Sequence, residues 1–312
     1  MKYTVKKIAG LIITLLIVSM LAFLAFELIP GDPARSILGT EATESKVQAL
    51  REEMGLNRPL PQRYGQWVKD FVTGDMGTSY SYQEPVKDLI ADKLPVTFTM
   101  TAMAFVFILL FFIPIGLLSV RYENRWIDKL FLIGNQVTMS IPPFFVGMIF
   151  TVIFGLTLRL FVPGGYISYT ENVSGFLGYL IFPSLALALP KAAMTAKMFR
   201  NALLSEMHKD YIRTAKSRGN GPWRILICHA FRNGIMPVIT FLGMAAADLI
   251  ANSMVIEQVF GIPGLGRTLI SSISNRDYPV VEAVIVLIAA VILILNTIVD
   301  LLYRALDKRI VL

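Results

Sequence analysis

Long hydrophobic runs separated by polar links dominate the pattern of residues along this chain. Each run is long enough to cross the hydrocarbon core of a bilayer as an α-helix, which takes about 20 residues. The runs cover approximately residues 8–29, 94–120, 130–161, a stretch from 179 to beyond 197, 238–256 and 280–303. The pattern predicts an all-α, polytopic integral membrane protein with six transmembrane helices.

The third run, residues 130–161, is longer than one straight crossing needs. It contains Pro142 and Pro143, and proline removes a backbone donor and clashes with the preceding helical turn. We therefore expect a kink or break at these prolines, with neighbouring helices bonding to the freed carbonyls.

A polar segment follows the first run and is expected to be extracytoplasmic. Its pattern predicts one short helix after Thr43 and a second from Pro61 to about Thr73. The second carries Tyr64 and Trp67 at amphipathic spacing. These apolar stripes are expected to pack the segment onto itself or onto the membrane surface; a substrate-binding role is the alternative.

Composition and charge agree with a membrane protein. Of the 312 residues, 55% are hydrophobic and 16% are charged, whereas soluble domains are about a quarter charged. The net charge of +7 is interpreted as positively charged cytoplasmic links rather than a nucleic-acid surface. The basic residues at both ends and in alternate links place both termini in the cytoplasm. The single cysteine and two histidines leave little for a metal site, and no metal or cofactor is expected.

The first run is interpreted as a retained helix, because it exceeds a usual signal-peptide core and no small-residue cleavage site follows. The expected organisation has three parts. These are an N-terminal helix with its extracytoplasmic segment (1–93), a transmembrane domain (94–303) and a cytoplasmic tail (304–312).

The basic stretch 200–237 separates two apolar regions and is expected in the cytoplasm. We expect an amphipathic helix from about Leu203 to Arg218, a reversal at Gly219 and Gly221, and a short helix opened by Pro222. Such a helix–turn–helix suits insertion into a groove on a cytoplasmic partner. An ordinary solvated loop is the alternative.

This stretch resembles the cytoplasmic coupling loop of type I ABC transporter permeases. Ala215, Gly219 and Pro237 stand where that family has alanine, glycine and proline, whereas Thr214 replaces a usual alanine. The stretches 26–33 and 260–267, with 276–279, resemble the B-type subunit of the dipeptide, oligopeptide and nickel importers. The resemblance covers essentially the whole chain.

The resemblance implies one half of a translocation path in an ABC importer of the bacterial cytoplasmic membrane, working by alternating access. Its partners would be a homologous second permease, two cytoplasmic ATPase subunits, an extracytoplasmic substrate-binding protein and membrane lipid. Peptide is the preferred cargo, with nickel or a metal–chelator complex as alternatives. Nine residues are expected to contact the ATPase or to transmit its movement to the membrane helices. They are Glu206, Asp210, Tyr211, Arg213, Thr214, Ala215, Arg218, Gly219 and Trp223.

Two further patterns bear on function. Residues 261–268 nearly match a phosphate-binding loop, but they follow a membrane span instead of a buried strand, so ATP binding by this chain is not expected. Asp248 lies near the middle of the fifth span with Asn252 one turn on. An ionisable group at that depth indicates either a place on the translocation path or a pairing with a neighbouring helix.

Two other functional classes fit the sequence less well. An ion-coupled secondary transporter would show inverted repeats and membrane-embedded ion sites, and only Asp248 is a candidate for such a site. An intramembrane hydrolase needs a catalytic constellation at depth, and neither histidine falls in a predicted span. This chain is therefore not expected to be an enzyme.

Overall fold

The computed structural model describes residues 2–27, 33–38, 42–53 and 55–306. Within these ranges the chain is helical, and the one bridge between extended residues joins Thr78 to Pro85. The chain divides into two compact units, Met1–Val96 with Pro263–Ile294 and Thr97–Ile262 with Leu295–Leu312. The boundaries between the units fall within helices α5 (Val86–Arg121) and α14 (Tyr278–Leu306).

Within the described residues, five helices are long and apolar enough to cross a membrane. They are Lys6–Ala25 within α1 (Lys2–Glu27), α5, α8 (Val173–Met207), α12 (Met236–Phe260) and Tyr278–Leu301 within α14. A sixth candidate is the pair Trp126–Ser140 and Pro143–Thr157. The prediction of an all-α, multi-pass membrane protein is therefore confirmed.

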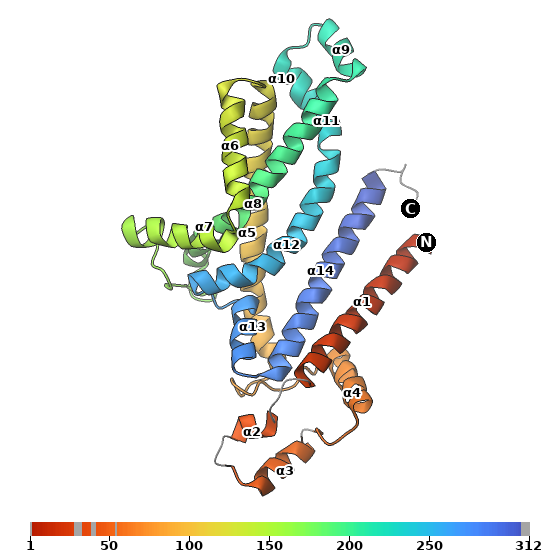
Figure 1. Ribbon diagram of the computed structural model, residues 1–312, viewed down its shortest axis with the longest axis vertical. Helices are drawn as coiled ribbons and strands as arrows, with labels where there is room; N and C mark the ends of the chain where they lie inside the picture. Colours follow the sequence, from red (N-terminus) through yellow and green to blue (C-terminus); the bar gives the residue numbers. More distant parts are fainter. Residues whose placement is uncertain (1, 28–32, 39–41, 54, 307–312) are drawn as a thin grey trace. The chain divides into compact units, whose positions relative to one another are not determined.

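The third hydrophobic run is broken where its prolines lie. Helix α6 (Trp126–Ser140) ends before Ile141, and α7 (Pro143–Phe150) starts after the extended Pro142. A π-helical segment, η1 (Thr151–Thr157), continues α7, and the two parts of the run meet at an angle of 100° (Figure 1). The expected break is confirmed, and it is sharper than a kink.

Helix α8 is the centre of the second unit and packs against α5, α6, α7 and α12. Its approach to α5 is close because Gly116 has no side chain: an added Cβ would lie 2.4 Å from the Phe199 ring. Phe199 also meets Phe112 edge-on at 5.4 Å. Ser184 donates a hydrogen bond of 3.0 Å to the Met100 carbonyl, which ties the same two helices further along.

The first unit contains the short helices α2 (Pro33–Leu38), α3 (Glu44–Glu53), α4 (Leu60–Thr73) and α13 (Leu265–Ser274). Helices α3 and α4 are the two that the polar segment predicts. The Tyr64 hydroxyl on α4 lies 2.8 Å from the Ser19 hydroxyl on α1, and its ring meets Phe23 at 5.6 Å. Tyr64 of α4 thus packs on α1, whereas the sequence predicts that the segment packs on itself or on the membrane surface.

Two spans begin earlier than the hydrophobic pattern predicts. Helix α5 starts at Val86 and runs continuously across the predicted boundary between residues 93 and 94. Helix α8 starts at Val173, where the Asn172 side chain caps it by accepting a 3.0 Å hydrogen bond from the Gly175 amide. The first turns of α5 contain charged residues, and those of α8 contain Ser174 and two glycines, so hydrophobicity alone marks both starts too late.

Candidate functional site

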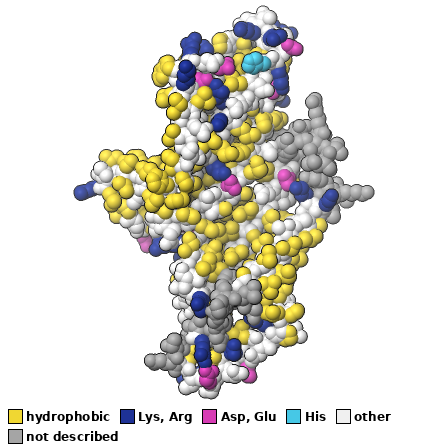
Figure 2. Space-filling model, in the orientation of Figure 1, with side chains coloured by type: hydrophobic (Ala, Val, Ile, Leu, Met, Phe, Trp, Pro, Cys, Tyr) yellow, Lys and Arg dark blue, Asp and Glu magenta, His cyan; other side chains and the backbone are white. Residues whose placement is uncertain are grey.

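The predicted coupling loop forms a small helical cap at the end of α8. It consists of α9 (Asp210–Ser217), α10 (Pro222–Arg224), the π-helical segment η2 (Ile225–Ala230) and α11 (Phe231–Gly234). Figure 1 shows α9 and α10 beyond the end of α8. Lys and Arg side chains gather over this tip, and the flank of the same unit below it is mostly hydrophobic (Figure 2).

The single helix expected over 203–218 is wrong, because α8 ends at Met207 and α9 begins at Asp210. Lys209 between them has extended backbone angles. Side chains hold this break in place. Glu206 accepts a 2.6 Å hydrogen bond from Lys209 and a 2.7 Å bond from the Tyr211 hydroxyl, and Asn233 donates to that hydroxyl at 3.1 Å.

These contacts also fix the protonation of the tip. The hydrogen bond to Glu206 raises the pKa of the Lys209 ammonium, so the group is charged at neutral pH. Burial raises the pKa of the Tyr211 phenol, which therefore remains a hydrogen-bond donor. The hinge between α8 and α9 is thus held by a charged pair and a neutral phenol.

Helix α9 has one packed face and one exposed face. Ile212 and Ala215 are 4% and 6% exposed, and α9 packs against η2. Asn220 donates a 2.9 Å hydrogen bond to the Ala215 carbonyl, which holds the end of the helix. Of the predicted coupling residues, Asp210, Tyr211, Arg213, Thr214, Arg218, Gly219 and Trp223 lie on exposed positions of the same tip.

The turn after α9 needs glycine for its backbone and not for space. Gly219 has φ +78°, which side-chain-bearing residues rarely adopt, and a Cβ added there would meet nothing within 4 Å. Pro222 then opens α10, as the sequence predicts. The structure brings all nine predicted coupling residues together.

A second group of charged residues lies along the spans. Asp248 on α12 forms an ion pair with Lys191 on α8, and Asn252 donates a 2.8 Å hydrogen bond to the Asp248 carbonyl. The sequence marks Asp248 and Asn252 as candidates for the path, and Lys191 as a lysine inside the fourth apolar run, but it does not predict that Lys191 pairs with Asp248.

A third group, also missed, is a buried ion pair between α6 and α8. Asp128 is 1% exposed and accepts hydrogen bonds from Arg200 at 2.8 and 2.6 Å and from the Asn124 amide at 3.1 Å. It also accepts one from the Ser119 hydroxyl on α5. Every acceptor direction of this carboxylate is used, so the group ties three helices together.

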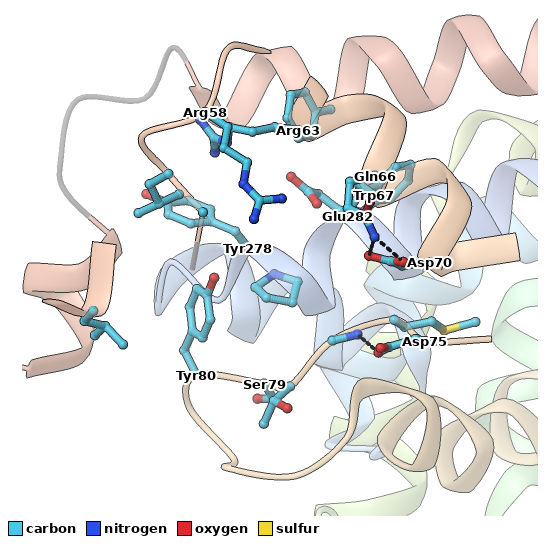
Figure 3. Close-up of a pocket in the computed structure, with 18 of the residues that line it drawn as sticks. Arg58, Arg63, Gln66, Trp67, Asp70, Asp75, Ser79, Tyr80, Tyr278 and Glu282 are labelled. Carbon is cyan, nitrogen blue, oxygen red and sulfur yellow. Dashed lines mark hydrogen bonds between the residues drawn. The ribbon is translucent and has the colours of Figure 1, made fainter. Parts of the chain in front are cut away.

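The first unit contains a cavity of about 730 Å³. Its lining includes Arg58, Arg63, Trp67, Tyr80 and Glu282, whose side chains surround one space in Figure 3. Burial raises the pKa of the Tyr80 phenol well above its ordinary value.

The loop at residues 79–81, which forms one wall of this cavity, is held by hydrogen bonds to Asp277. The buried Asp277 carboxylate accepts hydrogen bonds from the Ser79 hydroxyl at 2.5 Å and from the amides of Tyr80 and Ser81 at 3.0 and 3.1 Å. The sequence analysis did not predict this cavity, because its walls come from segments about 200 residues apart.

The near-match to a phosphate-binding loop is preceded by helix α12 where a nucleotide fold has a strand. Gly261 ends that helix in the left-handed conformation, with φ +69°, and α13 starts at Leu265. The segment is therefore a turn between two helices.

Comparison with known proteins decides the family. Residues 112–312 match the family described as binding-protein-dependent transport system inner membrane component, and residues 1–101 match the N-terminal family of the same transport systems. The chain belongs to the binding-protein-dependent ABC permeases. This permease is 36% identical over 305 residues to a putative peptide transport system permease protein of Brucella abortus, covering 98% of this chain and 97% of the relative.

Other relatives of the permease carry related names. A probable peptide ABC transporter permease protein of Sinorhizobium fredii is 32% identical over 308 residues, which cover 99% of this chain and 98% of the relative. The glutathione transport system permease protein of Pectobacterium atrosepticum is 35% identical over 310 residues, 99% of each chain. The predicted type I permease of the peptide-importer family is confirmed.

Proposed function

We propose that this permease forms half of the translocation path of a peptide importer in the bacterial cytoplasmic membrane and is moved by separate ATPase subunits that bind its α9 tip. The observation that carries the proposal is α9 itself. It exposes one face, packs the other against η2, and is pinned to the end of α8 through Glu206. The names of the relatives support peptide as the cargo class.

The proposed orientation has both termini and the α9 tip in the cytoplasm, and the segment between α1 and α5 outside. The clustering of basic residues in alternate links supports it. In this orientation the substrate-binding protein meets the permease from the side of α3 and α4. A homologous second permease completes the path.

In the proposed mechanism, ATP binding closes the two ATPase subunits and draws the α9 tips of the two permeases together. The exposed Asp210, Arg213 and Thr214 contact the ATPase groove, flanked by Tyr211, Arg218 and Trp223. Ile212 and Ala215 transmit the movement, because they are packed against the rest of the unit. The spans then open toward the binding protein, and ATP hydrolysis restores the inward-open state.

Replacing Gly219 with Asp tests this role. The substitution forces a side chain onto a left-handed backbone at the tip and should abolish stimulation of ATPase activity by peptide-loaded binding protein. Gly164→Asp is a matched control, since Gly164 has φ +76° and equally open surroundings but lies outside the tip. Full coupling in Gly219→Asp, or equal loss in both variants, would count against the proposal.

Nickel or a metal–chelator complex is the alternative cargo. The ligand retained by the binding protein that stimulates this complex distinguishes the two. An ion-coupled transporter would instead accumulate solute in vesicles without ATPase subunits, driven by a proton or sodium gradient alone.

A further inference from the structure

Lys191 and Asp248 form an ion pair near the middle of two membrane-spanning helices, and the pair is open on one side. The side chains are 23% and 54% exposed, respectively. The Asp248 side chain therefore faces away from the core of its own unit while remaining bonded to Lys191.

The exposed stripe of α12 shows what Asp248 faces. Met244 and Val255, at 53% and 46% exposed, lie on the same side of the helix as Asp248, because residues four and seven apart share a helical face. An apolar stripe alone would suit lipid. A carboxylate near the middle of a bilayer does not, since it costs several kcal/mol unless it faces protein or water. The stripe is thus expected to face protein or water instead of lipid, and under the proposed function this is the translocation path.

Asp128 shows that Asp248 is not merely a structural tie. Asp128 is enclosed and accepts four hydrogen bonds, two of them from Arg200. In the described part of the chain, the Asp248 carboxylate accepts one, from Lys191. It retains acceptor capacity on its exposed side, where a ligand could donate.

We propose that Lys191 and Asp248 form a charge-neutral binding site for the two termini of a short peptide on its way through the membrane. This inference rests on the proposed function. The peptide ammonium donates to the Asp248 carboxylate, and the peptide carboxylate accepts from the Lys191 ammonium. One ion pair within the protein is exchanged for two with the ligand.

The charge balance selects a zwitterion. A simple cation pairs with Asp248 and leaves Lys191 without its partner, and a simple anion does the reverse. Either leaves one of the two charges with water as its only partner, which is less favourable than an ion pair in this partly enclosed site. A ligand with both charges leaves none, and without ligand Lys191 and Asp248 pair with each other, so this site holds no net charge between transport cycles.

The test uses the assembled permease–ATPase complex in nanodiscs without the binding protein. Cys228→Ser removes the single cysteine, and Asn252→Cys places a thiol one turn from Asp248. The rate at which a small neutral methanethiosulfonate labels this thiol is measured at increasing concentrations of tri-alanine, N-acetyl-tri-alanine or tri-alanine amide. Tri-alanine should slow labelling, and each blocked peptide should protect about tenfold more weakly, as expected for about 1.4 kcal/mol of lost ion pairing.

Two variants make the test specific. The double variant Lys191→Met/Asp248→Asn removes both charges and leaves neither without its partner. In this variant all three peptides should protect the thiol equally. The control Asp128→Asn with Arg200→Met removes the enclosed pair and should leave the tenfold preference unchanged. Equal protection by the three peptides in the parent complex, no protection by tri-alanine, or a preference that survives in Lys191→Met/Asp248→Asn would overturn the inference.

ATP-dependent uptake is measured separately, with binding protein present in proteoliposomes. Absence of any ATP-dependent peptide uptake by the parent complex would refute the proposed function. Uptake of tri-alanine without the tenfold preference in the labelling assay would refute this site alone.

Discussion

The enclosed pair between Asp128 and Arg200 should be worth far more to stability than the open pair between Lys191 and Asp248. Arg200→Met removes two hydrogen bonds to a carboxylate that is 1% exposed. Charge-assisted bonds contribute about 1.5–3 kcal/mol each. Stranding a buried charge by removing its partner typically costs about 3–5 kcal/mol. Both routes give the same range for this substitution.

Lys191→Met is the matched control, because it also removes a cation from a carboxylate on a neighbouring helix. The Asp248 side chain is 54% exposed, so water can replace the lost partner. Exposed ion pairs contribute about 0–1 kcal/mol. The difference between the two variants should be about 3 kcal/mol in the free energy of unfolding.

The assay is thermal unfolding of the purified complex in one detergent. The fraction of complex that remains monodisperse is measured after heating to each temperature. Arg200→Met should lower the midpoint by about 10 °C, and Lys191→Met by about 2 °C or less. Adding Asp128→Asn to Arg200→Met should restore most of the loss, since it removes the stranded charge and keeps an acceptor for Ser119. Equal shifts in the two single variants, or no recovery in the double variant, would refute this reasoning.

Three further outcomes are expected. Asp277→Asn should destabilise the loop at 79–81 by about 1–3 kcal/mol, because it alters a buried acceptor of three hydrogen bonds. The loss is measured as faster hydrogen exchange of the amides in this loop. The control Asp75→Asn changes an exposed carboxylate and should not speed this exchange. Because the pKa of Tyr80 is raised in the folded state, its contribution to stability is complete below the ordinary phenol pKa of about 10 and is lost as the pH rises above it. The unfolding temperature should therefore fall less steeply above pH 10 in Tyr80→Phe than in the parent protein. Ala215→Phe should cost about 1–3 kcal/mol by overpacking α9, measured by thermal unfolding, whereas Phe at the exposed Ser217 should be neutral.

Local chemistry explains which parts of the fold the sequence predicts. The break at Pro142 and Pro143 and the start of α10 at Pro222 depend on residues that act on their own backbone. The turn at Gly219 is of the same kind. The spans are predicted because their hydrophobicity reflects the solvent around them. Their starts are not, because α5 extends into charged sequence and α8 into a stretch that contains Ser174, Gly175 and Gly178.

The break between α8 and α9 has no such local signal. His208 and Lys209 are neither glycine nor proline, and the amphipathic pattern continues across them. The break is held by Glu206 and by Asn233, which acts through Tyr211 and lies 22 residues beyond it. Contacts across such distances cannot be read from periodicity.

The charged groups show the same limit more strongly. Asp248 is visible in the sequence as an acid in an apolar run, but its partner Lys191 is 57 residues away. Asp128 and Arg200 are 72 residues apart, and each stands in a polar link or at the edge of one, where a charge is unremarkable. Their pairing follows from the packing of α6 on α8, which only the structure gives.

The length of α8 relates movement at Lys191, near the middle of the helix, to movement at its end beside α9. The helix has 35 residues, about 52 Å at 1.5 Å per residue, and contains Pro183 and Pro190. From Lys191 to Met207 no proline interrupts it, so this part, about 25 Å long, is expected to swing as one rod. A change of about 10° in its direction at Pro190 would shift the base of α9 by about 4 Å, comparable to the width of one side chain. In the proposed mechanism, a displacement of that size at the α9 tip corresponds to a small rotation of α8 at Lys191, and the same rotation would carry a signal from an occupied path to the tip.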